Sequence, residues 1–260
     1  MNDLYETIKP FLNKTILSKY KFGFAGEVYI EADKFEEEYN QYFLILEKYF
    51  SLKKPFYCNR NHTYYSTDIS ETTDLIKNIV IDAGHGDWDP GKVAKDGTLE
   101  KDINLQISKY LQGYLEQSGG FVLTTRIDDT ALSNKKREDL KERKNIANNE
   151  NVDLLVSIHQ NSFPKENVKG AQVFYYESSE ESKKLAECVQ NRLKEIDNTN
   201  NRVAKENKDY YLLKQTAMPS IIVECGFLSN TEENNKLKNE EYQKKIAWAI
   251  YLGILDYYNN

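Results

Sequence analysis

The sequence predicts an α/β fold with a mostly parallel sheet that is covered by helices on both faces. Short, continuous apolar runs of the kind found in strands buried on both sides recur along residues 77–260. Between them lie longer segments in which apolar residues repeat at helical spacing. Regular alternation of strand and helix implies βαβ units, in which each crossover helix packs against the sheet.

The predicted elements follow one another in a regular order from residue 77. Asn78–Ala83 is an apolar run that stops at a glycine, and 101–117 carries its apolar residues on one helical face. The segment 134–149 has its charges on one face of a helix. The other strands and helices are expected at Phe121–Thr125, Asp153–Ile158, Ala171–Tyr176, 179–197, Ser220–Cys225 and 240–257.

The first 76 residues differ from the rest in composition. They hold half of the aromatic residues of the chain, mostly Tyr and Phe mixed with Lys and Glu. A polar stretch at 66–74 has the composition of a linker. We therefore predict an N-terminal extension of unknown role over residues 1–76, with a strand near 22–30 and a helix near 33–50, and a catalytic domain over residues 77–260.

Composition excludes several classes of protein. The chain has 260 residues and a formal net charge of -6, so it offers no basic stripe for broad nucleic-acid binding. No run of 18 apolar residues predicts a transmembrane helix, and the N-terminus lacks the pattern of a signal peptide. Three widely separated cysteines fit neither a disulfide framework nor a cysteine-based zinc site.

Two of the three histidines follow directly on predicted buried strands. His85 comes after Asn78–Ala83 and is flanked by glycines, and His159 comes after Asp153–Ile158. Because ligands bind at the carboxyl ends of parallel strands, both imidazoles are expected to reach one crevice. Two acidic residues share that edge: Glu224 at the end of the strand Ser220–Cys225, and Glu100 in the first turn of the helix that follows His85.

Two neutral imidazoles and one carboxylate make a catalytic zinc site with an open position for water. A second carboxylate beside such a site can take the proton of that water, which permits amide hydrolysis near neutral pH. Each residue also has a plainer interpretation: a histidine after a strand is often structural, and a glutamate in a first helical turn favours the helix dipole. Asp82 and Asp87 are interpreted as turn formers. Burial of Glu224 in a strand is costly unless the residue is paired or functional.

Other common hydrolase layouts are missing from the sequence. There is no HExxH segment, which a helical metalloprotease site would need, and no GxSxG nucleophile elbow. The segment DAGHGD lacks the Gly-Lys-Ser/Thr ending of a phosphate-binding loop.

Three segments, in this order, resemble the zinc N-acetylmuramoyl-L-alanine amidases of bacterial cell walls: IVIDAGHGDWDPGKVAKDGTLEKDINL, LLVSIHQNS and MPSIIVECGFLSN. The resemblance covers about residues 77–258. It implies a twisted, mostly parallel sheet of about six strands between helices. It also implies one Zn²⁺ per chain, held by His85, Glu100 and His159, with Glu224 as the catalytic acid and base. Asn104 and Arg126 match positions for which supporting roles are expected.

The resemblance further implies the substrate, because members of the family cleave the amide between N-acetylmuramic acid and L-alanine of peptidoglycan. SIHQNSF and KDYYLLKQTAMPSIIVECGFLSN are most similar to the sporulation amidases that act on spore cortex in the muramic-δ-lactam pathway needed for germination. A location in the cell wall or cortex, in the forespore intermembrane space, and a docking or activating protein partner are then expected.

The alternatives are a phage endolysin that is made in the cytoplasm and released through a holin, an inactive wall-binding or regulatory protein, and a different zinc hydrolase such as a peptidase. The missing signal peptide favours the endolysin, because sporulation amidases normally begin with an anchor or signal.

Overall fold

The computed structural model describes residues 78–118, 120–148 and 152–259, together with three two-residue strands nearer the N-terminus. The chain divides into two compact units, Met1–Ile76 with Glu116–Gly119, and Lys77–Leu115 with Gly120–Asn260. In the first unit, β1 (Lys21–Phe22), β2 (Val28–Tyr29) and β3 (Thr63–Tyr64) form an antiparallel sheet in the order β1-β2-β3. The predicted strand at 22–30 lies largely outside the described residues, and the helix at 33–50 and the linker at 66–74 lie wholly outside them. The boundary after residue 76 stays a prediction.

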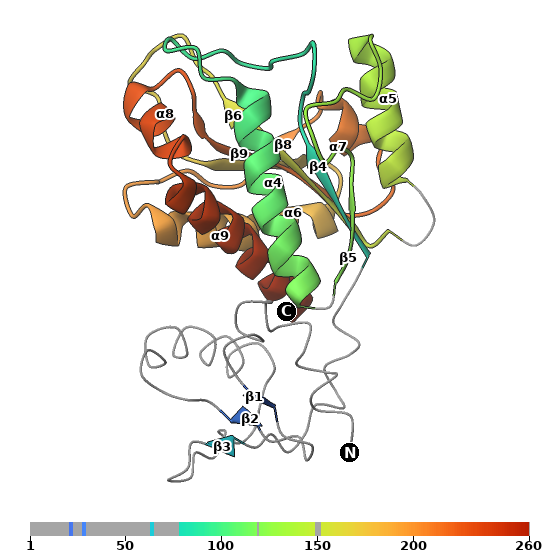
Figure 1. The fold of residues 1–260 in the computed structure, drawn as a ribbon. Coiled ribbons are helices and arrows are strands. Elements are labelled where there is room, and N and C mark those ends of the chain that lie inside the picture. Colours follow the sequence, from blue (N-terminus) through green and yellow to red (C-terminus); the bar gives the residue numbers. More distant parts are fainter. Residues whose placement is uncertain are drawn as a thin grey trace. The chain divides into compact units, whose positions relative to one another are not determined.

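The second unit is built on a six-stranded sheet in the order β5-β4-β6-β9-β7-β8 (Figure 1). β5, β4, β6 and β9 run parallel to one another, whereas β7 is antiparallel to β9 and β8 is parallel to β7. The predicted α/β fold with a mostly parallel sheet is confirmed. The strands are β4 (Asn78–Ala83), β5 (Phe121–Thr124), β6 (Leu154–Asn161), β7 (Gln172–Tyr176), β8 (Lys205–Asn207) and β9 (Ser220–Phe227).

Four long helices lie close to their predicted positions. They are α4 (Glu100–Gln117), α5 (Lys136–Ala147), α6 (Glu180–Ile196) and α9 (Glu240–Asn259). The Ser179 side chain caps α6 by accepting from the Ser182 N–H, as a serine before a helix commonly does. None of the helices in the described part of the chain combines the length and hydropathy needed to span a bilayer.

The two faces of the sheet carry different cores. One face packs against α4, α6 and α9 through a large apolar cluster that includes Ile81, Ile158, Val223 and Leu111. Trp248 of α9 joins this cluster, with its ring 5.1 Å from that of Tyr114. The opposite face has two small clusters. Val80 and Leu155 pack with Ala147 of α5, and Phe174 and Ile222 pack with Leu213 of α7 (Tyr211–Gln215).

The second, thinly covered face also carries polar residues at the carboxyl ends of the parallel strands. Asp82 pairs in register with Ser157, and two residues further along β6, His159 pairs with Glu224 of β9. Gln172 of β7 then pairs with Glu224. Residues directly opposite each other on neighbouring strands project from the same face, so His159, Glu224 and Gln172 form one row across the sheet, and Asp82 and Ser157 lie in the adjacent row on the same face.

Candidate metal centre and active site

His85 lies in a loop with unusual backbone geometry directly after β4. His85 and Asp87 have φ angles of 64° and 47°, in the left-handed region that non-glycine residues seldom adopt. The intervening Gly86 also has a positive φ, and a Cβ there would lie 2.2 Å from the Thr130 carbonyl oxygen. The loop is therefore held in a form that the sequence would not adopt by itself.

Two buried arginines hold this loop through its carbonyl groups. Arg143 of α5 donates from Nη1 to the Ala83 oxygen at 2.8 Å and from Nη2 to the His85 oxygen at 2.7 Å. Arg126 donates from Nε to the Ala83 oxygen at 2.8 Å and from Nη2 to the Gly84 oxygen at 3.0 Å. Three consecutive carbonyls thus receive charge-assisted hydrogen bonds, which are stronger than neutral ones.

The His159 ring lies against the backbone at the start of the same loop. A Cβ on Gly84 would approach the His159 Cε1 atom to 2.2 Å, so only glycine fits. The Gly84 N–H donates to the Ile158 oxygen at 3.1 Å, which ties the loop to β6. The two imidazole rings meet edge to face, with centroids 5.0 Å apart.

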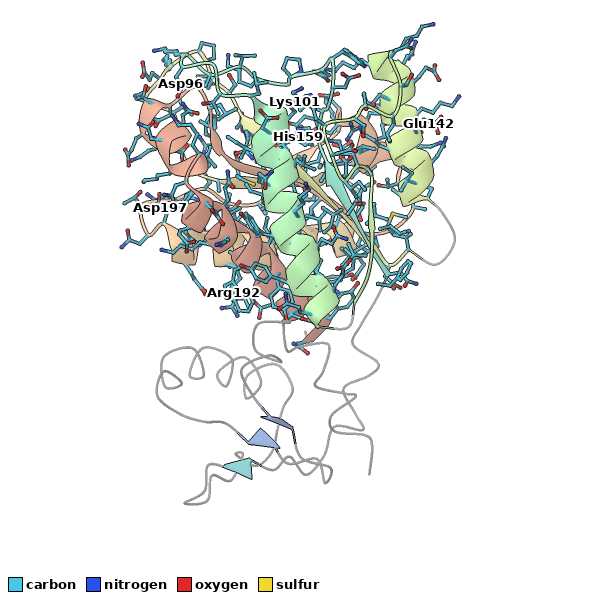
Figure 2. All side chains as sticks on the ribbon, in the orientation of Figure 1. Asp96, Lys101, Glu142, His159, Arg192 and Asp197 are labelled. Atoms are coloured by element: carbon cyan, nitrogen blue, oxygen red, sulfur yellow. The ribbon has the colours of Figure 1, made fainter. Side chains whose placement is uncertain are left out.

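Glu100 joins the two histidines from the first turn of α4. Its Oε1 atom lies 3.2 Å from His85 Nε2 and 2.9 Å from His159 Nδ1, and it also accepts from the Gln160 N–H at 3.0 Å. Burial alone would raise the pKa of Glu100, but the two imidazoles hold it far below the usual value. The carboxylate therefore stays ionised, as a metal ligand requires. Figure 2 shows His159 beside the first turn of α4, where Lys101 is labelled.

These three side chains fit a zinc ion by the chemistry and spacing of their donor atoms. His85, Glu100 and His159 each offer one donor atom, and these three atoms lie within 4.8 Å of one another. Two ligands at about 2.1 Å from a tetrahedral zinc lie roughly 3.4 Å apart, close to the distances above. Asp89 accepts at 2.9 Å from the other ring nitrogen of His85, Nδ1, and so directs Nε2 toward the cluster. Such a carboxylate behind a histidine ligand is typical of zinc sites.

Glu224 lies beside the cluster with one oxygen unused. The side chain is buried, and among the described residues its Oε2 atom has no hydrogen-bond partner. Burial raises the pKa of Glu224 to about 7. The His159 charge opposes this rise, Glu100 adds to it, and His85 and a hydrogen bond from Tyr210 oppose it. A carboxyl that titrates near neutral pH can take up a proton and give it back.

The structure therefore brings together all four residues singled out from the sequence, and it adds residues that the sequence did not indicate. Asp89 contacts His85, Tyr210 contacts Glu224, and Arg143 contacts the loop after β4. None of these three residues belongs to a sequence motif that would have indicated it. Asp82 is not a turn former. It is buried on β4, where Arg143, Thr125 and Ser157 all donate to it. Asn104 and Arg126 do support the loop, because both donate to the Gly84 oxygen.

The loop after β4 that carries His85, called the donor loop below, also presents Trp88 to solvent. The ring is 43% exposed, and its indole N–H donates to the Ser133 oxygen at 2.9 Å. Asp87 is tied to the neighbouring loop in the same way, since its N–H donates to Asp129 at 2.8 Å. Loops after β4 and β5 are therefore bonded to each other beside the site.

Comparisons with known proteins give a consistent match to the second unit. A family model described as N-acetylmuramoyl-L-alanine amidase matches residues 79–256. The germination-specific N-acetylmuramoyl-L-alanine amidase of Bacillus subtilis is 37% identical over 190 residues, covering 70% of this chain and 80% of that protein.

Solved structures match over the same region. The CwlD amidase of Clostridioides difficile, solved in complex with the GerS lipoprotein, is 48% identical with a TM-score of 0.68, over 70% of this chain and 98% of that one. An N-acetylmuramoyl-L-alanine amidase of Clostridium difficile 630 is 36% identical with a TM-score of 0.66, over 72% and 98%.

Proposed function

The chain belongs to the N-acetylmuramoyl-L-alanine amidase family, and from that premise we propose that it is a zinc-dependent enzyme of the spore cortex. Its activity follows from the family: hydrolysis of the amide between N-acetylmuramic acid and L-alanine in peptidoglycan. The observation that supports zinc dependence is the cluster of His85, Glu100 and His159 beside Glu224, a buried carboxylate with an unpartnered oxygen, and the similarity to a germination-specific amidase supports the cortex.

We propose that His85, Glu100 and His159 hold the zinc and that Glu224 moves the proton. Bound zinc would polarise the lactyl carbonyl and make water acidic enough to react near neutral pH. Glu224 accepts the proton of the attacking water, for which its unpartnered Oε2 and its pKa near neutrality suit it. It then returns that proton to the nitrogen of the departing peptide, so that L-alanine leaves as a free amine.

The chain's other residues keep these groups in place during the reaction. Asp89 orients His85 through Nδ1, and Tyr210 donates to Glu224. The bonds from Arg126 and Arg143 fix the loop on which His85 sits. Geometry that is set before substrate binds lowers the cost of reaching the transition state.

Product analysis on two substrates tests this proposal. Purified spore cortex and vegetative cell wall are each incubated with zinc-loaded protein, and new amine termini and new reducing sugar ends are measured. We expect new L-alanine amines without new reducing ends, and faster release from cortex. Release of reducing ends would contradict amide cleavage, and faster release from vegetative wall would favour an endolysin instead.

Two variants separate chemistry from metal binding. Glu224→Gln should keep its zinc, measured by metal analysis, and lose turnover by a factor of about 100 or more. Glu206→Gln makes the same change at an exposed position on β8 and should behave as wild type. Retained turnover in Glu224→Gln would remove Glu224 from the mechanism. If the wild-type protein takes up no zinc and binds cortex without cleaving it, the inactive wall-binding alternative is favoured.

We also propose that the protein acts in the wall with a protein partner. The support is the CwlD amidase of Clostridioides difficile, which was solved together with a lipoprotein. If a partner activates this chain, the purified chain alone should cleave cortex more slowly than a sporulating-cell extract that contains it at the same concentration. Equal rates would show that no activator is needed.

A further inference from the structure

Arg202 lies in the loop between α6 and β8, and three contacts fix its side chain. Nε donates to the Lys169 oxygen at 2.8 Å, and Nη1 donates to Gln172 Oε1 at 2.9 Å. The guanidinium carbon is 4.6 Å from the centroid of the Phe227 ring. All three partners are neutral, so they hold the cation in place without balancing its charge.

The charge of Arg202 has no counter-ion in the described part of the chain. No carboxylate there comes within ion-pair distance of it, whereas Arg143 and Arg192 each pair with an aspartate. Glu233 is the charge that acts on it, and both Glu233 oxygens already accept backbone N–H groups. Burial lowers the pKa of Arg202. A half-buried cation held rigidly and left unpaired is a ready binding group for an anion.

The sheet connects this cation to Glu224 through Gln172. Arg202 bonds to Gln172, and Gln172 pairs in register with Glu224 on the neighbouring strand. Paired residues on antiparallel strands lie about 5 Å apart, and they share a face. Along the strand order, the two histidine donors come from the loop after β4 and from β6, Glu224 from β9, and Arg202 from the loop before β8.

This order gives the bound substrate a direction, provided that the proposed function holds. Glu224 returns a proton to the departing nitrogen, so the peptide leaves from the β9 side of the metal donors. Continuing outward across β7, the peptide reaches Arg202. An extended residue spans about 3.5 Å and neighbouring strands lie about 4.8 Å apart. A carboxylate on the second residue after the scissile bond therefore falls within reach of the guanidinium.

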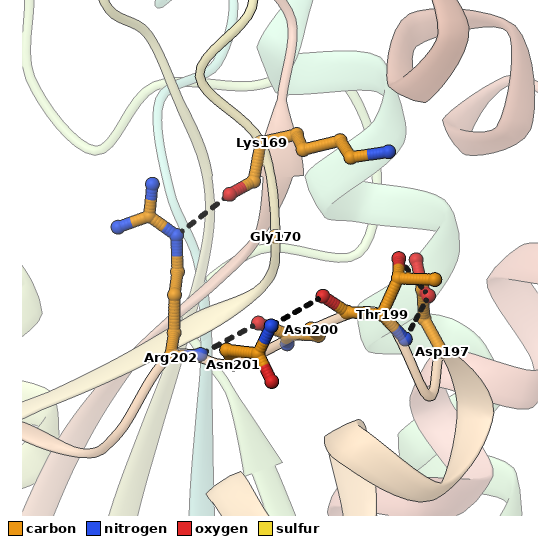
Figure 3. A pocket seen from close by; sticks show the side chains of 7 residues that line it. All are labelled: Lys169, Gly170, Asp197, Thr199, Asn200, Asn201 and Arg202. Atoms are coloured by element: carbon orange, nitrogen blue, oxygen red, sulfur yellow. Dashed lines mark hydrogen bonds between the residues drawn. The ribbon is translucent and has the colours of Figure 1, made fainter.

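We propose that Arg202 binds a carboxylate of the stem peptide, on the second residue after the cleaved amide, and thereby sets the specificity for acidic stems. Arg202 lines a pocket of about 310 Å³ together with Lys169, Gly170, Asp197, Thr199, Asn200 and Asn201. Figure 3 shows the guanidinium turned away from Asp197, which accepts from the Thr199 N–H and hydroxyl at the other end. The anion therefore binds the outer edge of the guanidinium, clear of the Asp197 charge.

Two synthetic substrates that differ in one group test the proposal. Both are disaccharide tripeptides whose second residue is γ-linked glutamate, with its α-carboxyl free in one and converted to a carboxamide in the other. We expect wild-type protein to show a KM about tenfold lower for the acid, the effect of one hydrogen-bonded charge, with similar kcat. Arg202→Gln should lose the preference and Arg202→Lys should keep part of it. Lys205→Gln, the same loss of charge three residues away at an exposed position, should keep it all.

The outcomes separate this proposal from the proposed function. Equal KM values for the two substrates in wild type, or an unchanged preference in Arg202→Gln, would refute the role of Arg202 and leave amidase activity standing. Cleavage of neither substrate would count against the proposed function. In that case the two tripeptides without the disaccharide, acid and amide, are synthesised and titrated into the protein by calorimetry. Tighter binding of the acid that is lost in Arg202→Gln supports Arg202, and equal binding overturns it.

Discussion

Replacing Arg143 by methionine should destabilise the protein severely, because it leaves the buried negative charge of Asp82 without its cation. Arg143 is 2% exposed and donates to Asp82, which is 1% exposed, at 2.8 Å. Burial alone would raise the pKa of Asp82, but Arg143, His159 and the Ser157 hydroxyl lower it from 3.8 to about 2. That difference corresponds to about 2 kcal/mol of stability at neutral pH.

The variant loses more than this pair. The bonds from Arg143 to the Ala83 and His85 carbonyls and to Asp139 disappear as well. Removing one partner of a buried ion pair typically costs about 3–5 kcal/mol, and we expect a loss in that range. For a unit of this size the melting temperature should fall by about 10 °C.

The loss should depend on pH in a defined direction. Asp82 with a lowered pKa stabilises wild type above pH 4, and that contribution disappears as the pH falls through about 2. In Arg143→Met, burial instead raises the pKa of Asp82 above its unfolded value, so the variant is least stable at neutral pH and recovers as Asp82 takes up a proton. The gap between the two proteins should therefore narrow between pH 7 and pH 4.

Urea unfolding followed by circular dichroism at pH 7 and pH 4 measures both effects on the full chain. Lys141→Met is the control on the same helix, because Lys141 is exposed and makes one long contact of 3.9 Å with Glu138. It should cost less than about 1 kcal/mol. Equal losses in the two variants, or a gap for Arg143→Met that does not change with pH, would refute the reasoning.

Three further substitutions probe the site itself. Asp89→Asn removes the carboxylate behind His85 and should weaken zinc affinity by about 10- to 100-fold in chelator competition; unchanged affinity would contradict its orienting role. Gly84→Ala places a Cβ 2.2 Å from the His159 ring and should abolish zinc binding, measured by metal analysis. Gly97→Ala is the control, because a Cβ there meets nothing within 4 Å. This variant should retain zinc and lose only some stability, since the φ of Gly97 is positive. Tyr210→Phe removes a bond that lowers the pKa of Glu224, so the acidic limb of the kcat/KM profile should move to higher pH; a limb that stays in place would remove Tyr210 from the control of that proton.

The parts of the fold that were predicted are those in which local pattern and tertiary role agree. The centre of Asn78–Ala83, Ile79–Ile81, is continuously apolar because both of its faces are covered, and α4 and α6 have apolar stripes. β8, α7 and α8 (Thr231–Leu237) were not predicted. Each has seven residues or fewer, and β8 is the polar sequence Lys-Glu-Asn at a sheet edge, where pairing with β7 sustains the strand without an apolar pattern.

The site likewise contains residues that local sequence indicates and residues that only the folded chain brings there. Both histidines could be placed because a strand end is visible in sequence, and Glu224 because a glutamate in a buried strand is costly. Glu100 could not be told from a helix cap by its position alone. Its environment depends on the loop folding back so that the Lys92 N–H donates to Oε2 at 2.7 Å. Arg143 reaches the His85 carbonyl from 58 residues away in sequence, and Tyr210 reaches Glu224 from outside the strand that carries it, which no local pattern encodes.

The positions of the two tryptophans have a practical consequence for spectroscopy. Trp88 and Trp248 are the only tryptophans in the chain. Trp248 packs among aromatic rings of the large core, whereas Trp88 is exposed in the donor loop, with its indole bonded to Ser133. In a Trp248→Phe protein, all indole emission would come from the donor loop. Such a protein would contain its own optical probe, whose emission wavelength and quenching report the loop directly, without an attached dye.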